Sequence, residues 1–141
     1  MMTENSAPAT QRKDALEVLV YSDNSDVRAE VIQAVGRRVA TELPEINFTE
    51  AATYEGTYQQ VRDGNFDLLI LDAETAKLGG IGMGKMVRDE IDPDIPYIIL
   101  IARPQDEWLA RVAKPEAILP FPVNPREISA TVADILRDRV K

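Results

Sequence analysis

Residues 67–72 read Asp67-Leu-Leu-Ile-Leu-Asp72, a run of branched apolar residues that ends on an acid. Similar short runs occur at 18–21, 97–101 and 117–119, each bounded by polar or turn residues. Runs of this length and composition are typical of strands that are buried on both faces of a parallel sheet. A weaker run at 46–50 alternates apolar and polar residues, which predicts an edge strand.

Segments with helical periodicity separate these runs. Residues 26–42 carry a valine at every fourth position, with Ser25 as the predicted N-cap and Pro44 just past the end. The other predicted helices are marked by Tyr54, Tyr58 and Val61, by Met83, Met86, Val87 and Ile91, by Trp108, Leu109 and Val112, and by Ile128, Val132, Ile135 and Leu136 after Pro125. Five alternations of strand and helix predict a doubly wound α/β sandwich, flavodoxin-like, with five parallel strands in the order 2-1-3-4-5.

The composition narrows the possible functions. The chain of 141 residues carries 24 acidic and 16 basic side chains, a formal net charge of -8. This charge repels phosphate backbones and anionic membrane surfaces, so we expect neither nucleic acid nor a membrane as a partner. His and Cys both number 0, which excludes imidazole bases, thiolate nucleophiles and metals held by either side chain. We expect a protein that is not an enzyme.

The chain is expected to form one domain at 15–141 behind a tail at 1–14. The tail is small, polar and without periodicity, which predicts disorder. It lacks the apolar stretch of a signal peptide, and the longest apolar run, 97–102, is far shorter than a membrane span. The predicted location is the cytoplasm.

In a sheet of order 2-1-3-4-5, the loops after the first and third strands are neighbours at the carboxyl edge. The first strand continues into Ser22-Asp23-Asn24, and the third ends on Asp72. We expect Asp23 and Asp72 to lie close enough to share a cation. Two carboxylates with a backbone carbonyl and waters make an adequate Mg2+ site. A carboxylate beside Mg2+ is also positioned to attack a phosphoryl donor.

These residues resemble the receiver domain of bacterial two-component response regulators, the fold of the chemotaxis response regulator. The resemblance extends from about Glu17 to the C-terminus. It rests on residues 67–72, on Gly80, and on Met86-Val-Arg88, with Pro96, Ala102-Arg103 and Pro122 at matching places. It implies that Asp72 is the phosphoacceptor, served by a histidine kinase. It also implies that Asp23, Asp72 and the backbone carbonyl of Glu74 hold Mg2+.

The chain departs from the family pattern at the positions that act on the phosphoryl group. Ser22 stands where the family has an acid, Ile101 where it has Thr or Ser, and Phe121 where it has Lys. Ile118 replaces the switch aromatic, and Ala76 replaces a proline. One preorganised contact of this kind is worth roughly 2.7–4 kcal/mol in catalysis. We therefore expect an atypical, stand-alone receiver of the actinobacterial type, with weak Mg2+ binding and weak or absent phosphorylation switching.

Three further features carry predictions of their own. Arg103 and Glu74 should rim the same crevice, where they either pair across the site or stay solvated with almost no energetic effect. The Phe121–Pro122 bond is expected to be cis, as the matching receiver bond usually is. The resemblance implies a partner face formed by the fourth helix, fifth strand and fifth helix, where Trp108 is either core or an exposed contact residue.

Other functions stay open. A phosphorylation-independent scaffold would use the same fold, and a homodimer through the partner face is one form of contact. A flavodoxin-like FMN protein needs a hydroxyl-rich phosphate loop after the first strand, whereas residues 22–25 include an acid and lack that run. A haloacid-type phosphatase needs a second Asp two residues after its nucleophile, which neither Asp23 nor Asp72 has.

Overall fold

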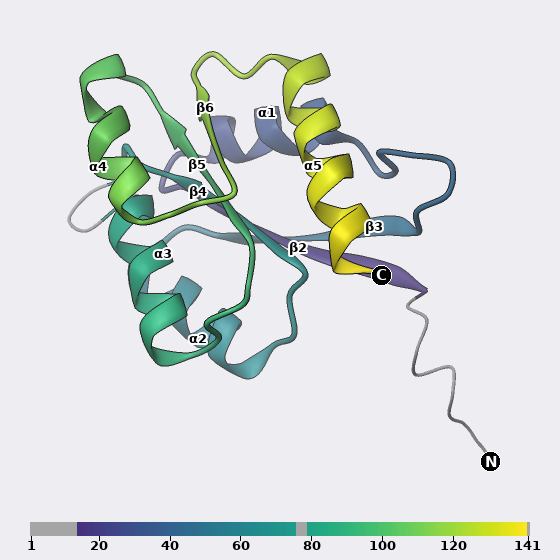
Figure 1. Ribbon diagram of the computed structural model, residues 1–141, viewed down its shortest axis with the longest axis horizontal. Helices are drawn as coiled ribbons and strands as arrows, with labels where there is room; N and C mark the ends of the chain where they lie inside the picture. Colours follow the sequence, from purple (N-terminus) through teal and green to yellow (C-terminus); the bar gives the residue numbers. More distant parts are fainter. Residues whose placement is uncertain (1–13, 76–78, 141) are drawn as a thin grey trace.

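The computed structural model describes residues 14–75 and 79–140, and the predicted tail up to residue 13 and Ala76 lie outside this part of the chain. Strands and helices alternate along it (Figure 1). The elements are β2 (Ala15–Tyr21), α1 (Ser25–Val35), β3 (Glu45–Ala51), α2 (Tyr54–Asp63), β4 (Leu68–Asp72), α3 (Gly79–Glu90), β5 (Tyr97–Ile101), the 3-10 turn η2 (Pro104–Asp106), α4 (Glu107–Val112), β6 (Ala117–Pro120) and α5 (Pro125–Arg139). None of the described helices is long and apolar enough to cross a membrane.

The strands form one parallel sheet in the order β3-β2-β4-β5-β6, which confirms the predicted order and the edge position of the weaker run. Tyr21 is paired with Leu71, so β2 and β4 end side by side. The residues that follow them therefore meet at one edge of the sheet. This register creates the site described below.

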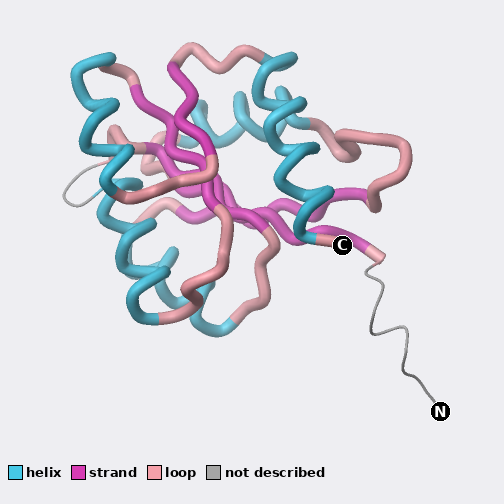
Figure 2. The backbone as a smooth tube through the Cα atoms, viewed as in Figure 1, coloured by secondary structure: helices cyan, strands magenta, loops and turns pink. Residues whose placement is uncertain are grey.

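Helices cover both faces of the sheet (Figures 1 and 2). Val18 and Val20 of β2 belong to the core under α1 and α5, whereas Leu19 and Tyr21 belong to the core shared with α2, α3 and α4. Side chains alternate between the two cores because successive residues of a strand point to opposite faces. Every residue of β4 is buried, which is why the run at 68–71 is apolar throughout.

Helix α1 differs from the prediction at both ends. Its N-cap is Asn24 rather than Ser25, since the Asn24 side chain accepts hydrogen bonds from two backbone N–H groups of the first turn. The helix ends at Val35 instead of continuing to residue 42. Gly36 stops it with a φ of 79°, and its N–H donates to the carbonyl of Ile32 at 2.9 Å.

The apolar residues that predicted helix α4 lie on its outer side. Trp108, Leu109 and Val112 are exposed by 65%, 43% and 59%, and the buried residue of this short helix is Ala110. The alternative that Trp108 belongs to the core is therefore wrong. The exposed side chains leave an apolar patch on the surface of α4.

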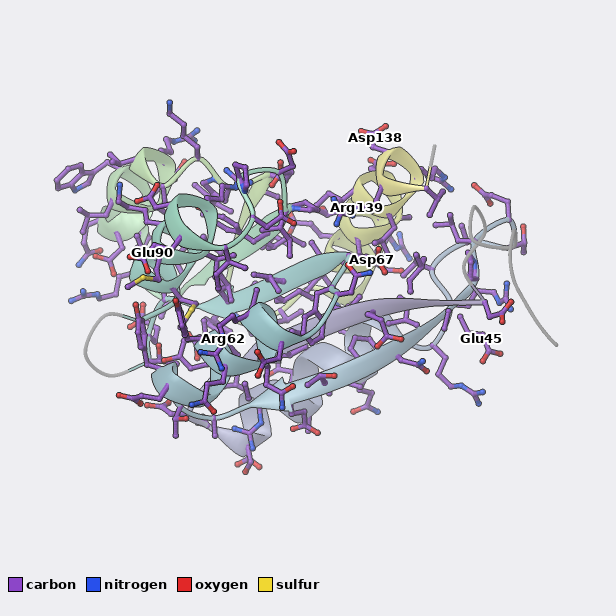
Figure 3. All side chains as sticks on the ribbon, turned by 90° about the horizontal axis from the view of Figure 1, so that it is seen from below. Glu45, Arg62, Asp67, Glu90, Asp138 and Arg139 are labelled. Atoms are coloured by element: carbon purple, nitrogen blue, oxygen red, sulfur yellow. The ribbon has the colours of Figure 1, made fainter. Side chains whose placement is uncertain are left out.

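Asp67, the first residue of the stretch at 67–72, lies just before β4, at the end of the sheet opposite Asp72. Asp67 is fully buried, and its carboxylate accepts the backbone N–H of Glu17 at 2.8 Å. Arg139 of α5 lies 3.7 Å from the same carboxylate and donates to the carbonyl of Phe66 at 3.2 Å (Figure 3). Asp67 thus ties β2 and the end of α5 to the start of β4, far from Asp72.

Candidate functional site

The site is centred on a hydrogen bond between residues 50 positions apart in the sequence. Ser22 follows β2, Asp72 ends β4, and the Ser22 hydroxyl donates to Oδ2 of Asp72 at 2.7 Å. The backbone N–H of Glu74 donates to Oδ1 of Asp72 at 2.8 Å. Ser22 is fully buried and Asp72 is only 4% exposed. Both oxygens of the carboxylate therefore have donors from the protein itself.

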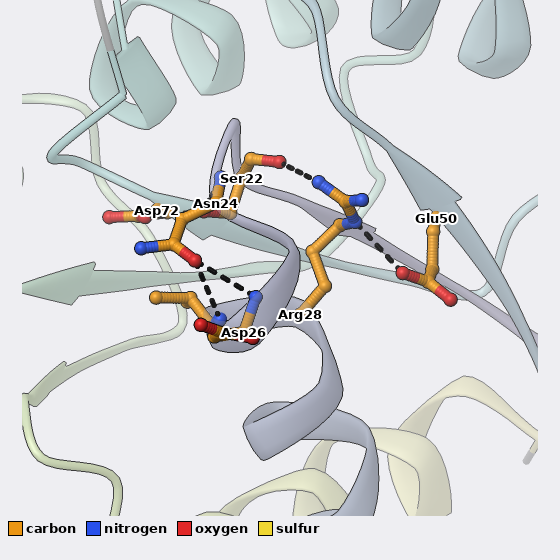
Figure 4. Close-up of polar contacts among 7 residues, drawn as sticks. Ser22, Asn24, Asp26, Arg28, Glu50 and Asp72 are labelled. Carbon is orange, nitrogen blue, oxygen red and sulfur yellow. Dashed lines mark hydrogen bonds and ion pairs between the residues drawn. The ribbon is translucent and has the colours of Figure 1, made fainter.

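Three further hydrogen bonds fix the position of Ser22. Its N–H donates to the carbonyl of Ala51 at 3.2 Å, and its hydroxyl accepts the N–H of Asn24 at 3.1 Å. Arg28 of α1 donates to the Ser22 carbonyl at 2.6 Å and pairs with Glu50 of β3 at 2.8 Å. Figure 4 shows Arg28 on the side of Ser22 away from Asp72. This arginine was not predicted for the site; it lies in the first turn of α1, six residues after Ser22.

Asp23, the other acid of the predicted cation site, contributes to the electrostatics of Asp72. Burial raises the pKa of the Asp72 carboxyl, the hydrogen bonds from Glu74 and Ser22 lower it in part, and the charges of Glu74 and Asp23 raise it again. Asp23 is exposed, in contrast to Asp72. The described residues hold no group of three or more acids arranged for a metal ion. A cation here would have these two carboxylates and backbone carbonyls as its protein ligands.

A second hydrogen-bond chain fixes the loop after β4. The Thr75 hydroxyl donates to the backbone carbonyl of Asp72 at 3.1 Å, and the Thr75 side chain is also hydrogen-bonded to the Tyr21 hydroxyl. Burial raises the pKa of Tyr21, and the bond to Thr75 lowers it in part. Neither residue was predicted for the site, although Ser and Thr hydroxyls often bond to a backbone group a few residues away in the chain.

Gly80, which supports the resemblance from the sequence, has a steric reason for its place. A Cβ atom there would lie 2.8 Å from the backbone carbon of Leu71 and 2.9 Å from that of Asp72. The start of α3 therefore passes directly against the end of β4. Only glycine permits this approach without a backbone shift.

The two positions where the family has Thr or Ser and Lys are apolar here. Ile101 is 5% exposed and Phe121 is half-buried, and both line a groove of about 220 Å³. The other residues of this groove are Ala102, Pro104, Glu107, Ile118 and Pro120. The Phe121–Pro122 bond is cis, as predicted. Ile101 and Phe121 bring neither a hydroxyl nor an amine to the site.

Arg103 does not close the crevice. It pairs with Asp106 at 2.9 Å, while the Glu74 carboxylate accepts the backbone N–H of Ala102 at 3.2 Å. The interpretation that Arg103 pairs with Glu74 is therefore wrong. Asp106 lies three residues away in the turn η2, so this local contact orders less chain than a bridge across the site.

The fold and the buried carboxylate at the carboxyl edge of the sheet match the arrangement of a receiver domain, although no family model matches the chain. An uncharacterized response regulatory protein of Mycobacterium tuberculosis, known from two strains, is 41% identical over 123 residues, which is 87% of this chain and 92% of that protein. The chain belongs to the response regulators. Its relative comes from an actinobacterium, as predicted.

Solved structures agree on the fold. The CheY-like receiver domain protein of Methanospirillum hungatei has a TM-score of 0.71 at 18% identity, covering 89% of this chain and 96% of its own. The Francisella response regulator 1452 receiver domain has a TM-score of 0.74 at 19% identity, covering 87% and 98%. Receivers signal to or from histidine kinases and other proteins, generally bind Mg2+ at the phosphorylation site, and generally perform no catalysis as their output.

Proposed function

We propose that this chain is an atypical receiver that acts through protein contact, with Asp72 at the phosphoacceptor position and little or no switching on phosphorylation. The observation that carries the proposal is the buried hydrogen bond between Ser22 and Asp72. In this proposal, Asp23, Asp72 and the backbone carbonyl of Glu74 hold Mg2+ weakly. A histidine kinase is the expected phosphoryl source, and a phosphorylation-independent scaffold is the limiting case.

The bond from Ser22 opposes phosphorylation. A carboxylate oxygen attacks phosphorus with a lone pair, and both oxygens of Asp72 already accept hydrogen bonds. Each carboxylate oxygen has two lone pairs, so Oδ2 keeps one that is free, but the hydrogen bond from Ser22 makes the carboxylate a weaker nucleophile. A hydrogen bond to a charged group contributes roughly 1.5–3 kcal/mol, so the weakening of this bond during attack would slow the reaction measurably. Bound Mg2+ would offset the repulsion between the carboxylate and an incoming phosphate.

The residues around Asp72 oppose a change of shape on phosphorylation. A phosphorylated and an unphosphorylated receiver differ in shape only if the phosphoryl group makes contacts in one state that it lacks in the other. Ile101 and Phe121 occupy the places from which the family supplies a hydroxyl and an ammonium group, and Arg103 is engaged by Asp106. The phosphoryl group would therefore have few contacts that favour a second state.

The proposed partner surface is formed by α4, β6 and α5. Trp108, Leu109 and Val112 are exposed on α4, and exposed aromatic residues are common anchors of protein interfaces. Beside them, α4 and the start of β6 border a second groove of about 280 Å³. A signalling protein or a second copy of this chain would bind on this surface.

Beryllofluoride, which mimics a phosphoryl group on a carboxylate, tests the proposal. Amide chemical shifts are recorded in excess Mg2+ with and without beryllofluoride, for the wild type and for Asp72→Ala. We expect shifts confined to the residues around Asp72 in the wild type and none in the variant. Large shifts across α4 would contradict weak switching. Shifts of equal size in Asp72→Ala would show that Asp72 is the wrong residue.

Ser22→Asp sharpens this test because it replaces the hydrogen-bond donor with a second acid. We expect this variant to bind Mg2+ more tightly than the wild type. Ser25→Asp, which adds the same charge at an exposed position nearby, is the matched control. If both variants gain the same Mg2+ affinity, general charge rather than the Ser22 position sets the affinity.

A further inference from the structure

Arg88 of α3 joins three segments on the side of the sheet that carries α4. Its guanidinium lies 4.3 Å from the centroid of the Tyr97 ring and donates to the carbonyl of Ile95 at 3.1 Å. It also donates to the carbonyl of Lys114, just past α4, and pairs with the Glu116 carboxylate at 2.7 Å. Its side chain is only 20% exposed. Arg88 therefore links α3 to the turn that leads from α4 into β6.

Tyr97, the first residue of β5, makes a second link to the same turn. Tyr97 is fully buried, and its hydroxyl donates to the carbonyl of Ala113, the C-cap of α4. The Glu116 carboxylate accepts the backbone N–H of Tyr97 at 3.0 Å, and the Glu116 N–H donates to the Tyr97 carbonyl at 2.9 Å. The end of α4 is thus bound to a residue that cannot move without the sheet.

The position of the Tyr97 ring is in turn fixed by α3. A Cβ atom at Gly84 would lie 2.6 Å from two carbon atoms of the ring, so the helix touches the ring where it has no side chain. Gly84 lies one turn before Arg88 on α3. The ring is therefore enclosed between the backbone of α3 and the guanidinium above it.

The turn that these contacts hold has a strained backbone. Lys114 has a φ of 57°, in the left-handed region that residues other than glycine rarely adopt. Such a conformation persists where the surrounding structure holds it. The bond from Arg88 to the Lys114 carbonyl and the bond from Tyr97 to the Ala113 carbonyl act on this turn from two sides.

We infer that Arg88, Tyr97 and Glu116 form a clamp that fixes the C-terminal end of α4 from α3, and that this clamp positions the exposed surface around Trp108 whatever the state of Asp72. The inference rests on the proposed function in one respect, that α4 carries the partner surface. Arg88 and Tyr97 are positioning residues, since they reach that surface only through the end of α4.

Hydrogen exchange tests the clamp in the full chain. Tyr97→Phe removes the bond to the Ala113 carbonyl and keeps the ring. We expect amides of α4 and of the turn at 113–116 to exchange about fivefold faster, the effect of losing one net hydrogen bond on a local opening. Amides of β2 and β4 should be unchanged. Tyr54→Phe is the matched control, because the buried Tyr54 hydroxyl has no hydrogen-bond partner among the described residues.

Arg88→Lys supplies a second variant, with Arg62→Lys on the surface of α2 as its control. Lysine keeps the charge but cannot make the forked contacts of the guanidinium, so the same amides should exchange faster. Unchanged exchange in α4 in both clamp variants would overturn the inference. Equal acceleration in β4 and α4 would do so as well, because it would assign these residues to overall stability alone.

Different experimental results would contradict the clamp and the proposed function. Large beryllofluoride shifts across α4 in the wild type contradict the proposed weak switching. Unchanged α4 exchange in Tyr97→Phe and Arg88→Lys contradicts the clamp. The fluorescence of Trp108, the one tryptophan of the sequence, gives an independent signal from α4 in both experiments.

Discussion

At the scale of single residues, Ser22 stands where the family has an acid, and this difference turns a repulsive contact with Asp72 into an attractive one. A second carboxylate beside Asp72 would repel it, whereas the Ser22 hydroxyl donates a hydrogen bond to it at 2.7 Å. The bond stabilises the ionised form of a buried carboxylate, for which burial is unfavourable. The same bond uses one lone pair of an oxygen that a phosphoryl donor or a cation would also approach.

Ser22→Ala is expected to destabilise the fold. It removes the donor to a buried charged acceptor, which is worth about 1.5–3 kcal/mol of unfolding free energy. Urea denaturation at neutral pH measures the change. Ser25→Ala, at an exposed position of the same segment, should change the unfolding free energy by less than about 0.5 kcal/mol. Equal effects of the two substitutions would contradict a specific role for the Ser22 hydroxyl.

Asp72→Asn is expected to stabilise the fold at neutral pH in buffer without Mg2+. The pKa of Asp72 is raised in the folded protein, so the folded state binds the proton more tightly than the unfolded chain. Stability of the wild type therefore falls as the pH rises from the ordinary pKa of 3.8 through the raised value, and the loss persists above it.

Denaturation across this pH range checks the prediction. The advantage of Asp72→Asn should grow with pH and then level off. Asp89→Asn, at an exposed position, controls for the loss of one negative charge from an acidic chain. An advantage that is the same at every pH would show that the ionisation of Asp72 is not its cause.

At the scale of elements, the loop between β2 and α1 serves both the site and the helix. Asn24 caps α1 through its side chain, and its N–H holds the Ser22 hydroxyl in place for Asp72. The start of α1 and the hydrogen bond to the Asp72 carboxylate therefore depend on the same short segment, residues 22–24. Arg28, in the first turns of the helix, adds a tie from this segment to β3.

Asn24→Ala is expected to lower the unfolding free energy by about 1 kcal/mol, the usual effect of losing an N-cap side chain. Thermal or urea denaturation measures it, and Ser25→Ala is again the comparison. A larger loss for Ser25→Ala than for Asn24→Ala would restore Ser25 as the N-cap. Because the substitution leaves the Asn24 backbone N–H in place, the bond to Ser22 should survive.

At the scale of the whole molecule, the sheet separates two cores, and its two ends carry different polar groups. The carboxyl edge carries Ser22 and Asp72, and the opposite edge is closed by Asp67 with Arg139. Between them, the outer side of α4 presents an apolar patch that no core residue requires. The proposed signalling surface is therefore separable from the stability of the fold.

Trp108→Ala tests that separation. Because Trp108 is 65% exposed, we expect its removal to change the unfolding free energy by less than about 0.5 kcal/mol. Ala110→Leu, on the buried side of the same helix, should cost about 1–3 kcal/mol through overpacking. A loss of about 3 kcal/mol or more for Trp108→Ala would mean that the indole is part of the core.

The ends of helices and the partners of charged side chains were the hardest features to predict from the sequence. The valine period continues past Gly36 because Val39 still packs on the same core from a loop, so the pattern overstated the length of α1. Arg103 and Glu74 were expected to rim one crevice, but Arg103 pairs with Asp106, an acid three residues away. Periodicity reports which residues face the core, and it does not report where the backbone leaves the helix.

The amino-acid sequence was sufficient for the strand order and for bringing the segments around Ser22 and Asp72 to one edge, because buried parallel strands need continuous apolar runs and right-handed crossovers allow few arrangements. The direction of each side chain was decided only in three dimensions. The bond from Ser22 to Asp72, the ion pair of Arg28 with Glu50 and the clamp on α4 join residues far apart in the chain, and their geometry depends on how the layers pack.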